Sequence, residues 1–253
     1  MKKPRLSRTM VGLFLGLACL SPAHASSVWV GGHTNVQIVD VNLSGTPVGT
    51  IPSPSGSPPT AAMAKVGTEV WWAGRNLTSI YRLDLSGAVL GVFGTPGGGP
   101  GGMTRIGNEV WVGSGSTNGI FRLDLSGNVL GSFGSPAGLT GGMTTVGNEV
   151  WWGSASTSGI FRLSSSGNVQ GSFGTPGGRT GGMTTVGNEV WWGSIDTTGI
   201  YRLNSSGVVI GAFGSPVGRV GGLGMVPLPA ALPLFGAMLG LLGVAGWKRN
   251  KIC

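Results

Sequence analysis

Side chains that could carry out acid–base, nucleophilic or metal chemistry are scarce in this chain. Its 253 residues include eight Asp and Glu, two His (His24 and His33) and two Cys (Cys19 and Cys253). A metal site needs several His, Cys or carboxylate ligands close together, and the sequence contains no such cluster. We therefore expect neither a metal nor another cofactor.

The one catalytic set that can be assembled is a Ser-His-Asp triad around His33, with Asp40 in the same segment. Serines are so frequent that such a set arises by chance, and no G-x-S-x-G turn presents one as a nucleophile. The run Gly97–Gly102, GGGPGG, fits the G-x-G-x-x-G pattern of dinucleotide-binding loops, but no helix follows it. These observations predict no catalytic residue and a protein that is not an enzyme.

Many of the charged residues recur at fixed intervals. A glutamate precedes each of four tryptophan-containing segments, and an arginine lies in the segment that follows each of them. The two sets are Glu69, Glu109, Glu149 and Glu189, and Arg82, Arg122, Arg162 and Arg202. We expect a Glu–Arg pair between neighbouring strands in each unit, rather than a ring of functional charges.

Polar loops between those two segments vary from unit to unit. They read GGHTNV, AGRNLTS, GSGSTNG, GSASTSG and GSIDTTG, and Asp196 is the only acid among their tips. Binding residues often lie on loops that a rigid scaffold supports, and Ser, Thr, Asn and Asp side chains suit sugar hydroxyls. The candidate ligand-binding residues are therefore Ser114, Asn118, Ser154, Thr157, Ser194, Asp196 and Thr197.

The elements that position these loops repeat with a period of forty residues, counted from Met63, Met103, Met143 and Met183. Each unit contains four short segments rich in β-formers, separated by Gly, Ser, Asn and Pro. We name these expected strands a to d, with MTTVG, EVWW, GIFRL and NVLGSFG as examples. Periods of this length are typical of closed propellers, solenoids or arrays.

Paired tryptophans stand in strand b of most units, as at Trp151 and Trp152. Successive side chains of a strand point to opposite faces, so both faces of the sheet need cover. This is the situation of a propeller blade packed between two neighbours. The alternative is an exposed tryptophan platform for stacking sugars.

The two ends of the repeat region complement each other. The first unit starts at Ser27 with strand b, and the last is followed by Gly221–Met225, GGLGM, which resembles strand a. Together they predict an all-β protein, a five-bladed propeller of four-stranded blades over residues 26–225, in which the last strand closes the first blade. An open solenoid is the alternative, and it would need capping repeats.

Both termini have the character of targeting segments. Residues 1–25 contain a basic start, the apolar run Met10–Leu20 and a small-x-small ending at Ala23 and Ala25, as signal peptidase requires. Residues 230–247 lack charge over eighteen positions and precede a basic tail, which predicts a transmembrane helix, with a buried C-terminal helix as the alternative.

The net charge of +8 comes mainly from these termini. Seven of the sixteen Lys and Arg lie in residues 1–25 and 226–253, whereas all eight Asp and Glu lie between them. The central region therefore carries only about one positive charge, and no nucleic-acid partner is expected.

The repeats, such as GIFRLDLSGNVLGSFGSPAGLTGG, resemble NHL-type propeller repeats and those of streptogramin (virginiamycin B) lyase. This resemblance implies a propeller over residues 27–225, although those families usually have six or seven blades. The lyase repeats tend to carry an acid two positions after the second aromatic of strand b. The corresponding residues here are not acidic: Gly32, Gly74, Ser114, Ser154 and Ser194.

Residues 226–253 resemble a more specific signal. Val226, Pro227, Leu228, Pro229 and Ala230, followed by the apolar stretch and the basic tail, are similar to the VPLPA variant of the PEP-CTERM sorting signal. The resemblance implies export in a Gram-negative bacterium, transient anchoring in the inner membrane and processing by an exosortase, often beside exopolysaccharide synthesis.

Taken together, these features predict a non-catalytic propeller at the cell surface or in the extracellular matrix, which binds polysaccharide or surface proteins. Signal peptidase and exosortase would be its partners during export. A surface enzyme on a propeller, either a lyase or a hydrolase, and a purely structural matrix protein without a ligand are the alternatives.

Overall fold

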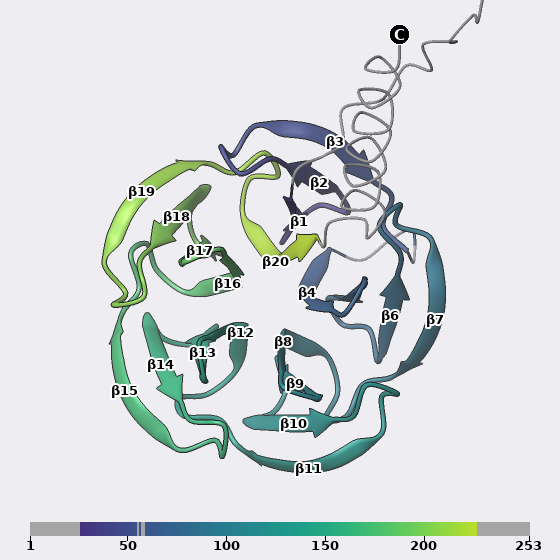
Figure 1. Ribbon diagram of the computed structural model, residues 1–253, viewed down its shortest axis with the longest axis vertical. Coiled ribbons are helices and arrows are strands. Elements are labelled where there is room, and N and C mark those ends of the chain that lie inside the picture. Colours follow the sequence, from purple (N-terminus) through teal and green to yellow (C-terminus); the bar gives the residue numbers. More distant parts are fainter. Residues whose placement is uncertain (1–25, 55, 57–58, 227–253) are drawn as a thin grey trace, which may run out of the picture.

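Five four-stranded antiparallel sheets surround a central axis in the computed structural model, which describes residues 26–54, 56 and 59–226 (Figure 1). This confirms the predicted all-β, five-bladed propeller. The predicted signal peptide, the residues from Pro227 onward and the expected C-terminal helix lie outside the described residues. Within the described ranges, no helix is long and apolar enough to cross a membrane.

Each blade runs outward from strand a at the axis to strand d at the rim. Strands a are β4 (Thr60–Val66), β8 (Pro100–Ile106), β12 (Thr140–Val146), β16 (Thr180–Val186) and β20 (Val220–Val226). Strands b are β1 (Ser27–Gly32), β5 (Glu69–Gly74), β9 (Glu109–Ser114), β13 (Glu149–Ser154) and β17 (Glu189–Ser194). Strands c are β2 (Ile38–Val41), β6 (Ser79–Leu83), β10 (Gly119–Leu123), β14 (Gly159–Leu163) and β18 (Gly199–Leu203). Strands d are β3 (Pro47–Ile51), β7 (Val89–Gly94), β11 (Val129–Gly134), β15 (Val169–Gly174) and β19 (Val209–Gly214).

Blade 1 contains both ends of the propeller. Its strand order is β20-β1-β2-β3, and β20 pairs antiparallel with β1, with Val28 opposite Met225 and Ser27 opposite Val226. Blades 2 to 5 each consist of four strands that follow one another in the chain. The predicted closure is therefore confirmed, and the sheet extends through Val226, the first residue of the expected sorting motif.

The paired tryptophans face opposite sides of their blade, as the alternation of strand side chains requires. Trp111 of blade 3 packs in one buried cluster with Trp152 of blade 4, while Trp151 packs with Trp192 of blade 5. The first indole of a pair also meets a phenylalanine of its own strand d edge to face, as Trp151 does with Phe173 at 4.9 Å. These tryptophans are therefore core residues and form no exposed stacking platform.

The second tryptophan of a pair has a buried polar partner. Trp152 Nε1 donates to Thr140 Oγ1 at 2.9 Å, and the same bond links Trp72 to Thr60 and Trp192 to Thr180. In the two blades without this tryptophan the threonine is also absent. Blade 3 has Val112 and Pro100 at the two positions, and blade 1 has Val30 and Val220. The hydroxyl thus occurs only in blades whose second position is tryptophan, whereas the buried Nε1 of the first-position Trp151 has no hydrogen-bond partner among the described residues.

Glycines of strand a allow neighbouring blades to approach closely at the axis. A Cβ added to Gly141 would overlap the carbonyl oxygen of Thr180 in the next blade, and one added to Gly142 would crowd the backbone of Gly182. Turn glycines such as Gly167, at φ 85°, have a different role, because glycine adopts this left-handed backbone conformation without a steric penalty. The Gly-Gly pairs of the strands thus set the narrow centre of a five-bladed ring, and blade 2 carries Ala61 and Ala62 in their place.

Ion pairs link strands b and c in blades 2 to 5. In each of them the arginine donates twice to the glutamate, as Arg162 does through Nε and Nη2 to Glu149 at 2.8 Å. The other three pairs are Arg82–Glu69, Arg122–Glu109 and Arg202–Glu189. The predicted cross-strand pairs are confirmed in four blades, while blade 1 has Ser27 and Asp40 at these positions.

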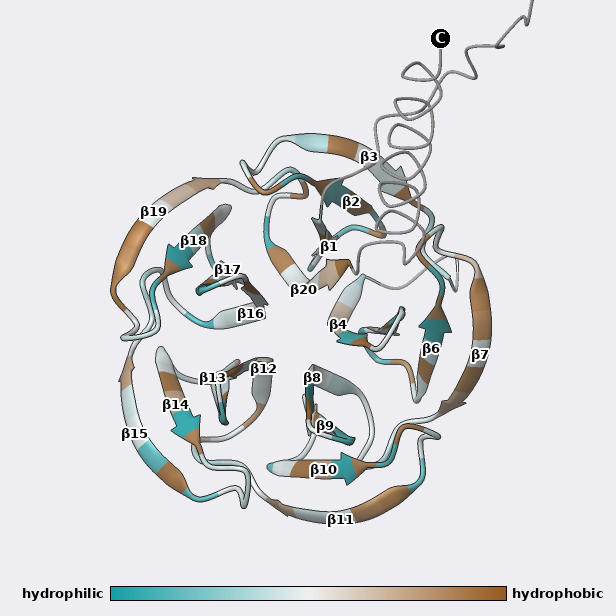
Figure 2. Cartoon of the chain, in the orientation of Figure 1, coloured by the Kyte–Doolittle hydropathy of each residue, from teal (hydrophilic) through white to brown (hydrophobic). Residues whose placement is uncertain are grey.

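Strands d form the rim, and apolar side chains lie exposed along several of them (Figure 2). Val129 and Leu130 of β11 are more than half exposed, as is Val208 beside β19. The outer strand of each blade is an open sheet edge, with only one neighbour. The core therefore lies between the blades and around strands a and b, and not beneath strands d.

Candidate functional site

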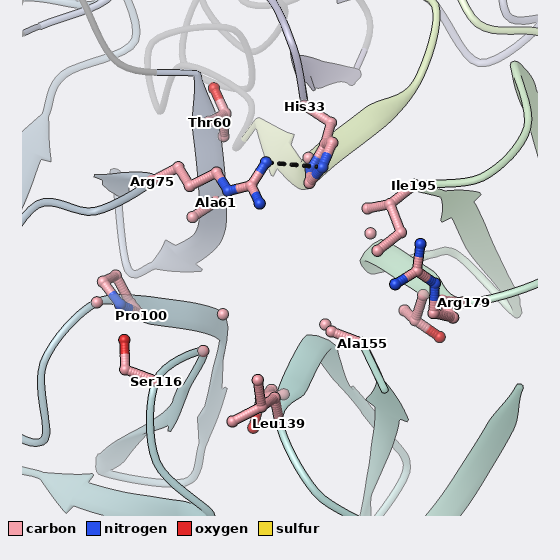
Figure 3. A pocket seen from close by; sticks show the side chains of 18 of the residues that line it. His33, Thr60, Ala61, Arg75, Pro100, Ser116, Leu139, Ala155, Arg179 and Ile195 are labelled. Carbon is pink, nitrogen blue, oxygen red and sulfur yellow. Dashed lines mark hydrogen bonds between the residues drawn. The ribbon is translucent and has the colours of Figure 1, made fainter. Parts of the chain in front are cut away.

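The b–c loops and the turns that precede strands a meet at one end of the central axis. They enclose an open cavity of about 280 Å³, to which all five blades contribute. Figure 3 shows side chains from loops far apart in the sequence, including His33, Arg75, Ala155 and Ile195, around this opening. We call this region the mouth cavity.

A buried ring closes the axis below the mouth cavity. It consists of equivalent strand a residues that are at most 3% exposed: Met63, Met103, Met143, Met183 and Leu223. A separate hollow of about 250 Å³ lies at the opposite end, beside Lys65, Arg105 and Thr144. The mouth cavity is thus a blind depression, and a ligand would enter and leave from the loop face.

One wall of the mouth cavity is cationic. Arg75 Nη1 lies 2.9 Å from His33 Nε2, and Arg179 donates from its Nη2 to Asp196 Oδ1 at 2.6 Å (Figure 3 shows the first contact). The His33 backbone N–H donates to the carbonyl of Arg219, a third arginine close to this wall that does not itself line the cavity. These residues come from blades 1, 2 and 5, which adjoin one another around the ring.

The surroundings of His33 keep its imidazole neutral. Partial burial lowers the pKa of His33 below its ordinary value of 6.5, and the charges of Arg75, Arg219 and Arg179 lower it further. The carboxylate of Asp196 opposes this effect weakly. A neutral ring accepts a hydrogen bond at Nε2, so His33 holds the guanidinium of Arg75 at the cavity.

The wall formed by blades 3 and 4 is small, with aliphatic and hydroxyl side chains. Leu139 and Ala155 of blade 4 line it together with Pro100 and Ser116 of blade 3, while Ile195 of blade 5 lies beside Arg179 (Figure 3). Among the described residues, no Trp, Tyr or Phe lines the cavity. The site therefore combines guanidinium donors with aliphatic and hydroxyl contacts.

The three serines predicted to bind a ligand serve the loops instead. Ser114, Ser154 and Ser194 are fully buried at the end of strand b. The Ser154 hydroxyl donates to the carbonyl of Ala137 at 2.9 Å and accepts from the backbone N–H groups of Ser156 and Thr157. The hydroxyls of Ser114 and Ser194 make the same bonds in blades 3 and 5.

None of the remaining predicted residues lines the cavity: Asp196, Asn118, Thr157 and Thr197. Asp196 lies beside it, because its carboxylate accepts from Nη2 and from the backbone N–H of Arg179, which does line the cavity. These bonds hold the pKa of Asp196 below its usual range.

Sequence reasoning missed the residues that build the mouth, although a signal for them is present. The first loop position after strand b differs in all five blades, with His33, Arg75, Gly115, Ala155 and Ile195, although blades 3 to 5 are nearly identical in their strands. The position before strand a also varies, with Pro59, Gly99, Leu139, Arg179 and Arg219. A position-by-position comparison would have found both sets.

The structure offers little support for a triad or a metal site. Asp40 lies within β2, opposite Trp29 of β1, whereas His33 is in the loop and contacts Arg75. In the part of the chain that the structure describes, no three His, Cys, Asp or Glu residues gather in a way that could hold a metal ion.

No protein-family model matches the chain, and no curated protein matches its sequence. Solved structures do resemble it. Catalytically inactive virginiamycin B lyase from Staphylococcus aureus with quinupristin has a TM-score of 0.50 at 19% identity, over 78% of this chain and 72% of that one. A chain of the nidogen–laminin complex has a TM-score of 0.53 at 15% identity, over 80% and 86%. A Bacteroides caccae protein of unknown function has a TM-score of 0.51 at 15% identity, over 75% and 73%. At these identities the likeness concerns the fold alone.

Proposed function

We propose that this chain is an exported, non-catalytic propeller that binds a polysaccharide or protein partner through the mouth cavity. One observation carries the proposal: the five blades share one strand arrangement, and blades 3 to 5 have nearly the same strand sequences, yet all five differ at the first loop position after strand b, which lines the mouth. A scaffold that varies where five loops converge is typical of a binding surface. The chain of similar fold in the nidogen–laminin complex belongs to a protein–protein assembly, which is consistent with this role.

The test blocks the cavity without touching the frame. Ala155 lines the small wall, so Ala155→Trp fills the opening, whereas Gln170→Trp places the same side chain on the exposed strand β15. We would screen the purified protein against glycans and against surface proteins of its host. The expected result is a bound partner that Ala155→Trp loses and Gln170→Trp keeps. Equal binding by both variants would place the partner elsewhere and refute the proposal.

Export and sorting are part of the same proposal and rest on the sequence of the two ends. Signal peptidase would cut after Ala25, and an exosortase would act at Val226–Ala230, which leaves the propeller at the cell surface or in the extracellular matrix. The mass of the protein recovered from the producing cell tests this. A protein that keeps residues 231–253 at the surface would contradict the sorting step.

A surface enzyme is the second candidate, because His33 lines the mouth cavity and a lyase has a similar fold. Metal-dependent turnover that His33→Ala abolishes would establish it. The geometry favours binding, since Arg75 occupies His33 Nε2 and the pKa of His33 is lowered by its cationic surroundings.

A further inference from the structure

We propose that the mouth cavity binds the carboxylate of an acidic sugar, a uronic acid residue of a polysaccharide, and that Arg75 and Arg179 hold it. This inference rests on the proposed function and specifies the chemistry of its ligand.

The mouth carries an excess of positive charge. Arg75 and Arg179 line the cavity, and Arg219 and Asp196 lie near enough to influence the pKa of His33. These four charges sum to about +2 when His33 is neutral. Among the described residues, Arg179 is the one arginine of this wall that forms an ion pair. The propeller as a whole is almost neutral, so the excess positive charge is local to the mouth. A concave, positively charged site attracts an anion.

Both arginines use only some of their N–H donors within the protein. Arg179 donates from Nε and Nη2 to Asp196, and Arg75 donates from Nη1 to His33 Nε2. No other hydrogen bond within the described residues uses Arg75 Nη2 or Arg179 Nη1. Both guanidinium groups are thus fixed in orientation by a partner yet keep donors free, and such donors suit the two oxygens of a carboxylate.

The rest of the cavity is small and mixed in polarity. Leu139, Ala155 and Ile195 offer aliphatic contact, and Ser116 offers a hydroxyl group. A volume of about 280 Å³ accommodates a six-membered ring with its carboxylate. A single Asp or Glu side chain of a protein would leave much of it to water. An acidic sugar ring therefore fits better than an acidic peptide.

His33 is a positioning residue. It holds Arg75 only while it is neutral, because a protonated ring has no acceptor at Nε2. Arg75, Arg179 and Arg219 oppose protonation in the free protein, and Asp196 favours it. The positioning of Arg75 is thus present at neutral pH and is lost as the pH falls through the pKa of His33.

The experiment measures binding of oligogalacturonate to the purified protein by calorimetry, with neutral oligogalactose and polyglutamate as comparison probes. Arg75→Gln should weaken oligogalacturonate binding about tenfold or more, because a hydrogen bond to a charged group is lost. Lys65→Gln removes the same charge at the opposite end of the axis and should leave binding unchanged. Higher salt should weaken binding to the wild-type protein, a result that needs no variant to fold.

The pH profile gives a readout that a merely structural role of His33 would not produce. His33→Gln keeps an acceptor for Arg75 and cannot gain a proton, so its affinity for oligogalacturonate should not respond to a fall in pH through the pKa of His33, whereas the affinity of the wild-type protein should fall. Equal binding of the neutral oligomer, preferred binding of polyglutamate, or no effect of Arg75→Gln would each overturn the uronate proposal. A neutral ligand that Ala155→Trp displaces while Arg75→Gln keeps it would leave the proposed function standing.

Discussion

At the scale of single residues, the second tryptophan of each pair has a buried hydroxyl as its hydrogen-bond partner. The Trp152 indole and the Thr140 hydroxyl form one such pair, and valine replaces the tryptophan wherever the threonine is missing. The mouth differs from the core, because its loop positions hold different residues in each blade. There His33 contacts and orients Arg75, and Asp196 contacts and orients Arg179.

Thr140→Val should destabilise the protein by about 1–3 kcal/mol, because it leaves the buried Trp152 N–H without an acceptor. Urea denaturation measures this loss. Valine itself fits the position, as Val220 shows in blade 1. In a Trp152→Phe background no N–H remains, and Thr140→Val should then cost little. An equal cost in both backgrounds would show that the hydrogen bond is not the cause.

At the scale of the elements, each strand has a distinct physical task. Strand a brings the backbone of one blade against the next, strand b fills both interfaces, and strand c carries the arginine that pairs with strand b. Strand d ends the sheet at the rim.

Gly141→Val should destabilise the protein by about 2 kcal/mol or more, because its side chain would overlap the carbonyl of Thr180 in the neighbouring blade. Gly171→Val is the matched control, since no atom lies within 4 Å of a Cβ added in strand β15. Thermal unfolding of the two variants provides the comparison. Similar unfolding temperatures would mean that the blades can separate at the axis without cost.

Acid should weaken the protein through its four Glu–Arg pairs. Hydrogen bonds from the arginines hold the pKa of Glu69, Glu109, Glu149 and Glu189 below their ordinary value of 4.5. The unfolded chain therefore takes up protons first, so this stabilisation is complete above pH 4.5 and is lost as the pH falls through the folded pKa values.

The measurement is the free energy of unfolding between pH 7 and pH 3. Glu149→Gln should flatten its decline below about pH 4.5, whereas the wild-type protein should lose stability steeply there. The pairs are partly exposed, so each contributes modestly at neutral pH. An unchanged slope in Glu149→Gln would exclude the pair as a source of acid sensitivity.

At the scale of the whole molecule, closure of blade 1 decides whether the ring is complete. Strand β20 covers β1 and packs Leu223 with Val28, Val30 and Trp191, which belong to blades 1 and 5. Without β20 the ring would have an open edge and an uncovered apolar face.

Removal of residues 220–253 should therefore abolish cooperative unfolding, whereas removal of residues 227–253 should leave the unfolding temperature of the propeller unchanged. Circular dichroism with heating distinguishes the two truncations. A cooperative transition in the protein that lacks residues 220–253 would show that four complete blades and three strands of blade 1 are stable without closure of the ring.

The sequence by itself determined the architecture, because a forty-residue period, strand alternation around Trp151 and Trp152, and a missing first strand a at Ser27 are local facts. The blade count, the closure and the Glu–Arg pairs follow from them. Only the tertiary structure decided where the candidate site lies. Loop residues such as Ser154 and Ala155 are neighbours in the chain, yet one is buried to hold the loop and the other faces the axis. His33, Arg75 and Arg179 belong to three different repeats, and they come together only because the ring closes.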